Sequence, residues 1–222
     1  MLKLRNSYSK WSLLMDFLFN QNVLLYLTAY LLAAVPFGFI LAKVFAGVDV
    51  RKEGSGNIGA TNVLRVLKEK APHLAKKLTI ATFALDALKG AVIILVAMAL
   101  GAEQAVLWTI AVLSVLGHCF SPFLAFEGGK GVATGFGVLL VMQPIPALIA
   151  IVVWLVAGKV LKISSLSSLI GLVVLLISSY IINPTIEGIV VHTPIWIIAF
   201  VIFYKHIPNI MRLINKEEAK VV

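Results

Sequence analysis

The chain has 222 residues, of which 60% are hydrophobic and 13% are charged, whereas an ordinary soluble domain has about 45–50% apolar and about 25% charged residues. This composition excludes a soluble globular protein. The formal net charge of +9 in so apolar a chain indicates membrane topology or anionic substrates, and no nucleic-acid partner is expected. The single Cys119 excludes an internal disulfide and a cysteine-based zinc site.

Long apolar stretches predict an all-α integral membrane protein with seven transmembrane helices. A span requires about 20 apolar residues, and five stretches of roughly this length contain no Asp, Glu, Lys or Arg. The N-terminal region lacks a compact apolar core followed by a small-residue cleavage site, so the first apolar run is expected to remain as a span. The expected spans are residues 22–46, 78–100, 104–120, 132–142, 145–161, 166–182 and 194–204.

The number of spans depends on residues 131–158, which form one long helix or two short ones broken at Pro144 and Pro146, where backbone donors are missing. Lys and Arg collect in short cytoplasmic loops. Seven spans place fourteen of these residues on one face and only three, all in the N-terminal tail, on the other. This favours seven spans with an external N-terminus and a cytoplasmic C-terminus. The expected organisation is one membrane domain, with a dispensable tail (1–21), a seven-span core (22–205) and a cytoplasmic tail (206–222).

The fourth expected helix, residues 132–142, is too short to cross a bilayer. It would rise about 17 Å at 1.5 Å per residue, less than the hydrocarbon thickness of about 30 Å. The preceding loop is therefore expected to reach into the membrane, or the bilayer to thin. Irregular backbone at that depth persists only inside protein or beside water, which indicates a cavity.

Small and polar residues form a continuous run at residues 54–62. Glycines bring backbone N–H groups close to a ligand, and Ser, Asn and Thr side chains add further donors. A short amphipathic helix is expected to follow, with an N-terminus that suits phosphate. The alternatives are a glycine-rich turn with a helix cap, and a solvated surface charge at residue 65. The candidate site residues in this region are Ser55, Asn57, Thr61, Asn62 and Arg65.

A Gly-Gly-Lys-Gly turn precedes the short fourth helix. Such a turn can wrap an anion with backbone N–H groups and add a lysine charge, although it lacks the spacing of a nucleotide P-loop. The alternative is that it only turns the chain. His118, ten residues earlier, is expected to be an interfacial histidine more often than a catalyst. The candidates here are Gly128, Gly129, Lys130 and Gly131.

The remaining candidates lie near the sixth and seventh spans. They are Ser168, His206 and Asn209, although serines also cap helices and the histidine also fits a membrane interface. Inside the second span, Asp86 and Lys89 share one helical face, which predicts a buried ion pair. Such groups usually mark function, and a purely structural pair is the alternative.

No metal site and no cofactor are expected. The chain has only three aspartates, at positions 16, 49 and 86. A carboxylate cluster of the kind that holds Mg²⁺ is therefore hard to assemble.

In their order and spacing, these strings resemble the bacterial acyl-phosphate:glycerol-3-phosphate acyltransferase family over about residues 23–215. Glu127, Ser121-Pro122 and Ile207-Pro208 depart from the family pattern, but none is a candidate site residue. The resemblance is carried by residues 35–38, 42–43, 47–51 and 54–62 with Arg65, Asp86 with Lys89 and Gly90, Gly117 with His118, residues 128–134, Ser165 with Ser168, and His206 with Asn209, Ile210, Arg212 and Leu213.

The resemblance implies a multi-pass enzyme of the bacterial inner membrane with a cytoplasmic active site. It would transfer a fatty acyl group from acyl phosphate to the 1-hydroxyl of glycerol 3-phosphate, giving lysophosphatidic acid and inorganic phosphate. We expect a monomer in contact with membrane lipid. The resemblance implies catalytic roles for Lys130, His206, Ser55, Asn57 and Arg65, and substrate-binding roles for Thr61, Asn62, Gly128, Gly129, Gly131, Ser168 and Asn209.

Individual roles follow from this assignment. Lys130 and the Gly128–Gly129 backbone would neutralise phosphate, while Arg65, Ser168, His206 and Asn209 would mainly bind glycerol 3-phosphate. Acyl phosphate already carries a good leaving group, so positioning and charge stabilisation supply much of the catalysis. The candidate bases are His206 and a phosphate oxygen of the substrate, and the resemblance favours the phosphate oxygen.

A small transporter or channel for an anionic solute is the competing class. Transporter sites tend to lie near the membrane midplane between structural repeats. Here the polar clusters gather at one predicted face, and no internal repeat is visible in the sequence. These features favour an enzyme.

Overall fold

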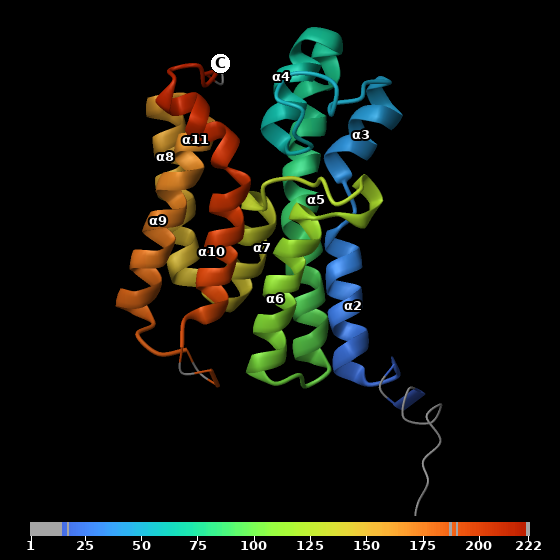
Figure 1. Cartoon of the computed structure of the whole chain (residues 1–222), viewed down its shortest axis with the longest axis vertical. Coiled ribbons are helices and arrows are strands. Elements are labelled where there is room, and N and C mark those ends of the chain that lie inside the picture. The colour runs from blue at the N-terminus through green and yellow to red at the C-terminus, as the bar shows by residue number, and fades with distance from the viewer. Residues whose placement is uncertain (1–14, 17, 187, 190, 221–222) are drawn as a thin grey trace, which may run out of the picture.

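The chain folds into helices joined by short segments (Figure 1). The structure, a computed structural model, describes residues 15, 16, 18–186, 188, 189 and 191–220. No β-strand occurs in this part of the chain, which confirms the prediction of an all-α protein. The expected N-terminal tail, with its three basic residues, lies largely outside the described residues.

Within residues 21–214, eleven helical elements follow one another in chain order. They are α2 (Gln21–Ala33), α3 (Phe37–Ala46), α4 (Ala60–Lys70), α5 (Pro72–Ala99), α6 (Gln104–Cys119), the 3-10 helix η1 (Pro122–Leu124), α7 (Val132–Met142), α8 (Pro144–Leu161), α9 (Ser164–Ile182), α10 (Thr193–Lys205) and α11 (Ile207–Ile214).

Four to six candidate membrane spans are present by length and composition. Helices α5, α6, α8 and α9 are each long and apolar enough to cross a membrane. Two bent pairs, α2 with α3 and α10 with α11, add up to two more. Helix α7 is apolar but, with 11 residues, falls below this length. The chain is therefore an integral membrane protein with several spans.

The prediction of one continuous helix over residues 22–46 is wrong. Helices α2 and α3 are separated by Ala34–Pro36 and bend by 41°. The reason is Pro36, which lacks an N–H donor and disfavours helical backbone at the residue before it. The expected break before Pro144 is confirmed, because α7 ends at Met142 and α8 begins after Gln143. The expected amphipathic helix after the first polar run is α4.

Helix α7 lies at the centre of the packing, with contacts to α5, α6 and α8 (Figure 1). Its approach to α5 is very close, because a Cβ added at Gly137 would overlap the backbone carbonyl oxygen of Ala87. Helices α2 and α6 approach similarly at Gly117, against the Tyr30 carbonyl. Glycine permits such contacts because it has no side chain. Close packing thus fixes the position of the short helix.

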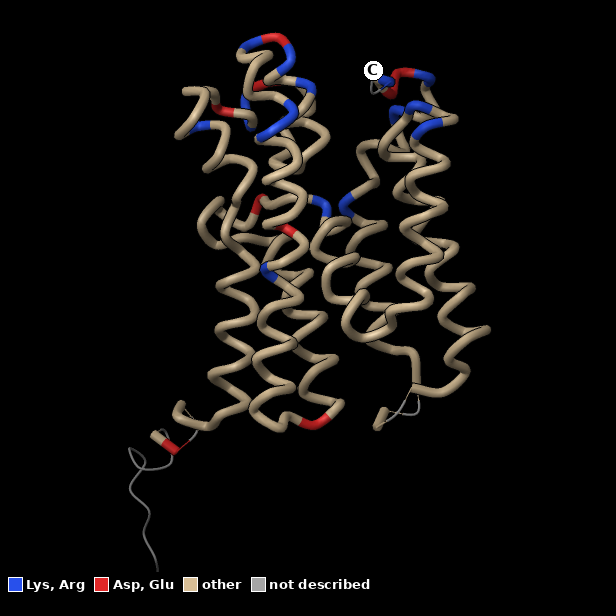
Figure 2. Tube along the Cα trace, turned by 180° about the vertical axis from the view of Figure 1, so that it is seen from behind, with Lys and Arg blue, Asp and Glu red and all other residues tan. Residues whose placement is uncertain are grey.

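Basic residues gather at one end of the fold. Figure 2 shows Lys and Arg around α3, α4, α11 and the C-terminus, whereas the opposite end carries none within the described part of the chain. Lys89 is the exception, since it is buried inside α5. The polar loops that contain the candidate site residues lie toward the basic end.

Candidate active site

Ten of the twelve predicted site residues line one cavity of about 100 Å³. Its walls come from the loop before α4, the start of α7, the start of α9, and the region around α11. The predicted residues in its lining are Ser55, Asn57, Thr61, Asn62, Arg65, Lys130, Gly131, Ser168, His206 and Asn209. Gly128 lines a neighbouring cavity of about 610 Å³, and Gly129 lines neither.

The loop before α4 is organised by Asn62, which is 2% exposed. Its Nδ2 donates to the carbonyls of Val50 (2.9 Å) and Asn57 (2.8 Å), and its Oδ1 accepts from the backbone N–H of Ser55 (2.8 Å). The amide is therefore already occupied by the loop backbone. Asn62 therefore positions Ser55 and Asn57, and its expected role in binding substrate stays a prediction.

Polar side chains join the α4 wall to the start of α9. The hydroxyls of Thr61 and Ser164 lie 2.9 Å apart. Ser168 Oγ donates to the Ser164 carbonyl (2.9 Å) and accepts from Trp154 Nε1 (3.3 Å). The Trp154 ring also stacks on Phe83, with 5.7 Å between centroids. One wall of the cavity therefore consists of hydrogen-bonded hydroxyl groups beside two stacked aromatic rings.

The glycine turn contributes differently from the expectation. The N–H groups of Gly128 and Gly129 donate to the carbonyls of Cys119 (3.1 Å) and His118 (3.0 Å), so they are not free to wrap a phosphate. Instead, Lys130, Gly131 and the first two residues of α7 line the cavity. The first N–H groups of a helix have no partner within the helix and favour anions. The α7 N-terminus, which lines the cavity, is therefore the group of N–H donors there that is suited to an anion.

Two cations face the cavity without a neutralising partner. Among the described residues, neither Arg65 nor Lys130 forms a salt bridge. Burial lowers the pKa of the Lys130 ammonium to about 8, an effect that the Glu218 carboxylate opposes and nearby cations reinforce. Lys130 still carries its charge near pH 7. A cavity with two unpaired cations is suited to an anionic ligand.

His206 lies at the end of α10 and is 1% exposed. Its Nδ1 lies 2.7 Å from the Ile202 carbonyl oxygen, which can only accept a hydrogen bond. Nδ1 therefore carries the hydrogen, and Nε2 of the neutral ring is an acceptor. Asn209, one turn later, has a buried Oδ1 without a partner in the described structure. Both side chains can accept hydrogen bonds from substrate hydroxyls.

Glu218, in the C-terminal tail, lines the cavity although the sequence did not indicate it. Its carboxylate accepts hydrogen bonds from Ser165 Oγ (2.6 Å), Asn209 Nδ2 (2.6 Å) and Arg212 Nε (2.7 Å), and the residue lines the cavity. Burial alone would raise the pKa of Glu218, but these three hydrogen bonds outweigh it and lower the pKa. A glutamate in a charged tail reads as solvated, so the sequence carried no signal for this contact.

We expect Glu218 to stabilise the fold only while it is ionised. Because its folded-state pKa is lowered, its contribution is present above the ordinary value of about 4.3 and disappears as the pH falls through the lowered value. Wild-type Tm should exceed that of Glu218→Gln by about 2–4 °C at pH 7, for a contribution of about 1 kcal/mol. The difference should shrink as the pH falls below about 4.3 and vanish once the pH is below the lowered pKa of Glu218. Glu217→Gln, at the exposed neighbour, is the control, and a pH-independent difference would contradict the assignment.

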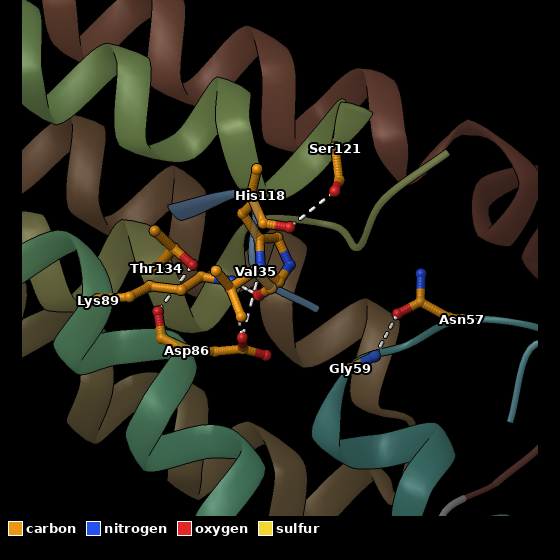
Figure 3. Close-up of polar contacts among 9 residues, drawn as sticks. Val35, Asn57, Gly59, Asp86, Lys89, His118, Ser121 and Thr134 are labelled. Atoms are coloured by element: carbon orange, nitrogen blue, oxygen red, sulfur yellow. Dashed lines mark hydrogen bonds and ion pairs between the residues drawn. The ribbon is translucent and has the colours of Figure 1, made fainter. Parts of the chain in front are cut away.

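The predicted buried pair in α5 is confirmed. Lys89 Nζ lies 2.8 Å from Asp86 Oδ1, and both residues are nearly inaccessible to solvent. His118 joins them, with its Nδ1 at 2.8 Å from Lys89 Nζ (Figure 3). Asp86 and His118 also line the cavity. His118 is thus part of a buried polar cluster, and its expected place at the membrane interface stays a prediction.

Within the described residues, no three His, Cys, Asp or Glu side chains come together as a metal site. We expect activity to survive EDTA, because the cations of the cavity come from Arg and Lys side chains. The measurement is the initial rate of the purified protein before and after chelation. Loss of activity that only Mg²⁺ restores would show that a metal site is needed.

Fold and site together define an integral membrane protein with a cationic cavity at its basic end. Residues 23–216 match the family model described as glycerol-3-phosphate acyltransferase. The chain belongs to the glycerol-3-phosphate acyltransferase family, which confirms the resemblance found in the sequence.

Relatives and solved structures agree with this assignment. The glycerol-3-phosphate acyltransferase of a Nitratiruptor species is 60% identical over 207 residues, covering 93% of this chain and 99% of the relative. The glycerol-3-phosphate acyltransferase of Campylobacter concisus is 60% identical over 202 residues, which cover 91% of this chain and 100% of the relative. The crystal structure of PlsY (YgiH), an integral membrane glycerol 3-phosphate acyltransferase, in its glycerol 3-phosphate form is 36% identical with a TM-score of 0.81, covering 90% and 96%. The crystal structure of its lysophosphatidic acid form is 35% identical with a TM-score of 0.79, and the match covers 90% of this chain and 95% of that one.

Proposed function

We propose that this protein transfers a fatty acyl group from acyl phosphate to the 1-hydroxyl of glycerol 3-phosphate, giving lysophosphatidic acid and inorganic phosphate. The observation that carries the proposal is the pair of unpaired cations, Arg65 and Lys130, beside the α7 N-terminus in one cavity. Both substrates are phosphates, and charge-assisted hydrogen bonds to phosphate are stronger than neutral ones. Membership of the family supports the acceptor.

The two phosphates have different partners in this proposal. Lys130 and the N-terminus of α7 neutralise the phosphate of the acyl donor. Arg65, Ser168, His206 and Asn209 bind glycerol 3-phosphate. Ser55 and Asn57, in the loop before α4, and Thr61, in its first turn, supply hydroxyl and amide groups, and no metal or cofactor takes part.

The reaction needs no acyl-enzyme intermediate. The 1-hydroxyl oxygen attacks the acyl carbonyl carbon, the bond from that carbon to the phosphate oxygen breaks, and phosphate leaves. The hydroxyl proton passes either to His206 Nε2 or to a phosphate oxygen of the substrate, and the family resemblance favours the second. The cavity then contributes positioning and charge stabilisation, which are effective for an activated donor.

In this proposal the acyl chain runs from the cavity toward the lipid along two neighbouring apolar cavities. A narrow cavity between α7, α9 and α10 shares Val132 and Ser168 with the candidate site. It shares Leu172 with an outer apolar groove of about 320 Å³ between α9 and α10. Trp196, Phe200 and other apolar side chains line this groove. It offers a place for the acyl chain beside the reacting phosphate.

The proposal includes location and topology. The protein would be one membrane domain of the bacterial inner membrane, acting as a monomer among lipids, with the active site facing the cytoplasm. Counting the short α7 as a span gives seven, with the N-terminus outside and the C-terminus inside. The gathering of basic residues around the site supports this orientation.

Reporter fusions test the topology. A reporter after Lys216 should be cytoplasmic, and one inserted between α9 and α10, after Asn183, should be external. The measurement is reporter activity in intact cells. Finding both reporters on the same side would contradict the seven-span arrangement.

The function is tested by phosphate release from purified protein given acyl phosphate and glycerol 3-phosphate. We expect phosphate and lysophosphatidic acid in equal amounts, and no product without the acceptor. Reconstituted protein that moves an anionic solute but releases no phosphate would instead support a transporter.

A further inference from the structure

A buried polar cluster lies directly behind the glycine turn and has no assigned part in the proposed reaction. It consists of Asp86 and Lys89 on α5 and His118 on α6, and each of the three is at most 4% exposed. Figure 3 shows them together between the helices. Charged groups at this depth are costly and usually serve function.

Lys89 uses its full donor capacity in this cluster. Its Nζ lies 2.8 Å from Asp86 Oδ1, 2.8 Å from His118 Nδ1 and 3.0 Å from the carbonyl oxygen of Val35 at the α2–α3 break. An ammonium has three N–H donors and no acceptor. His118 Nδ1 must therefore accept, so the ring is neutral and its hydrogen lies on Nε2. Lys89 fixes both the tautomer and the orientation of the ring.

The opposite edge of the His118 ring contacts the glycine turn. A Cβ added to Gly129 would overlap Nε2 and lie 2.8 Å from Cε1. The Gly129 N–H also donates to the His118 carbonyl (3.0 Å). His118 therefore holds Gly129 by both its backbone and its ring, and Lys130 is the next residue along the chain.

We propose that Asp86, Lys89 and His118 act as a positioning relay, in which Asp86 and Lys89 hold the His118 ring and the ring sets Gly129 so that Lys130 points into the cavity. This inference rests on the proposed function of the same site. The three residues are positioning residues, since they act on the turn that carries Lys130. A second hydrogen bond ties the relay to α7, where Thr134 Oγ1 donates to the Asp86 carbonyl (2.8 Å).

The first test separates positioning from stability. Lys89→Met leaves the Asp86 carboxylate buried without a partner, which strongly destabilises a fold. Asp86→Asn/Lys89→Met removes both charges, and we expect its Tm to return close to wild type. Because a methionine side chain has no N–H to hold the His118 ring, kcat/KM for phosphate release should remain about 100-fold below wild type, as for a misplaced catalytic group. Recovery of activity together with Tm would overturn the relay, because the pair would then be only structural.

The second test is a double-mutant cycle between His118 and Gly129. Gly129→Ala should lower kcat/KM by about 100-fold in the wild-type background, because its methyl group displaces a ring that Lys89 holds from behind. In the His118→Ala background there is room for the methyl group. Gly129→Ala should therefore lower kcat/KM by less than about 3-fold in that background. An equal cost in both backgrounds would overturn the inference. This cycle also decides the matter if the double variant at residues 86 and 89 fails to fold.

Ser114→Ala is the matched control. Ser114 lies one turn before His118 on α6, is equally buried, and its Oγ has no partner within the described residues. Its removal should leave kcat/KM unchanged. The wild-type assay distinguishes failure of the proposed function from failure of the relay. Inactive wild-type protein would refute the proposed function. Active wild-type protein without coupling between His118 and Gly129 would refute only the relay.

Discussion

Lys130→Ala should lower kcat/KM for phosphate release by roughly 10- to 150-fold while the protein inserts and purifies normally. Lys130 is partly buried, unpaired and adjacent to the α7 N-terminus. Removing it deletes a charge-assisted contact to phosphate worth about 1.5–3 kcal/mol, and the rate factor follows if that contact acts in the transition state. Steady-state kinetics with each substrate varied in turn gives the measurement.

Lys159→Ala is the control for this substitution. Lys159 lies in the last turn of α8 on an exposed surface and does not line the cavity. Its variant should keep wild-type kinetics. Near-normal kcat/KM for both substrates in well-folded Lys130→Ala would reject the phosphate role of Lys130.

Gly137→Ala should destabilise the protein more than Gly135→Ala, the other glycine substitution within α7. The new Cβ would overlap the backbone carbonyl of Ala87, and backbone cannot move aside unless α5 and α7 separate. Overpacking of this kind costs about 1–3 kcal/mol, which corresponds to a Tm lower by roughly 2–12 °C for a chain of this size. Activity should fall as well, since α7 carries one wall of the site.

Gly135→Ala provides the comparison within the same helix. Its Cβ would meet only the Cδ1 atom of Ile202, at 3.0 Å, and the end of a side chain can shift. We therefore expect a Tm within about 2 °C of wild type. Equal loss of Tm in the two variants would show that α5 and α7 do not approach at Gly137 as described.

Much of the fold follows from local signals in the sequence. Proline and charge marked the break between α7 and α8, and the apolar runs marked α5, α6, α8 and α9. The break in the first span at Pro36 was missed because its flanks are equally apolar, and hydropathy alone does not register a missing N–H donor. Helix α11 was missed because its eight residues are fewer than a sequence pattern resolves.

The members of the site were predictable, but several of their roles were not. Polar residue type and clustering pointed to Arg65, Lys130 and His206. The N–H groups of Gly128 and Gly129 donate to carbonyls of α6. This pairing depends on tertiary contact, so no local sequence pattern predicts it. The same holds for Glu218, whose partners Ser165 and Asn209 lie 53 and 9 residues away.

The span of chain that builds the cavity has a consequence for biosynthesis. Its lining runs from Ser55 to Ala219, and domains fold as their residues emerge during synthesis. A nascent chain with every helix up to α9 inserted still lacks His206, Asn209 and Glu218. The cavity is therefore complete only after residues 206–219 have been made, later than the helices α2 to α9 that build its other walls.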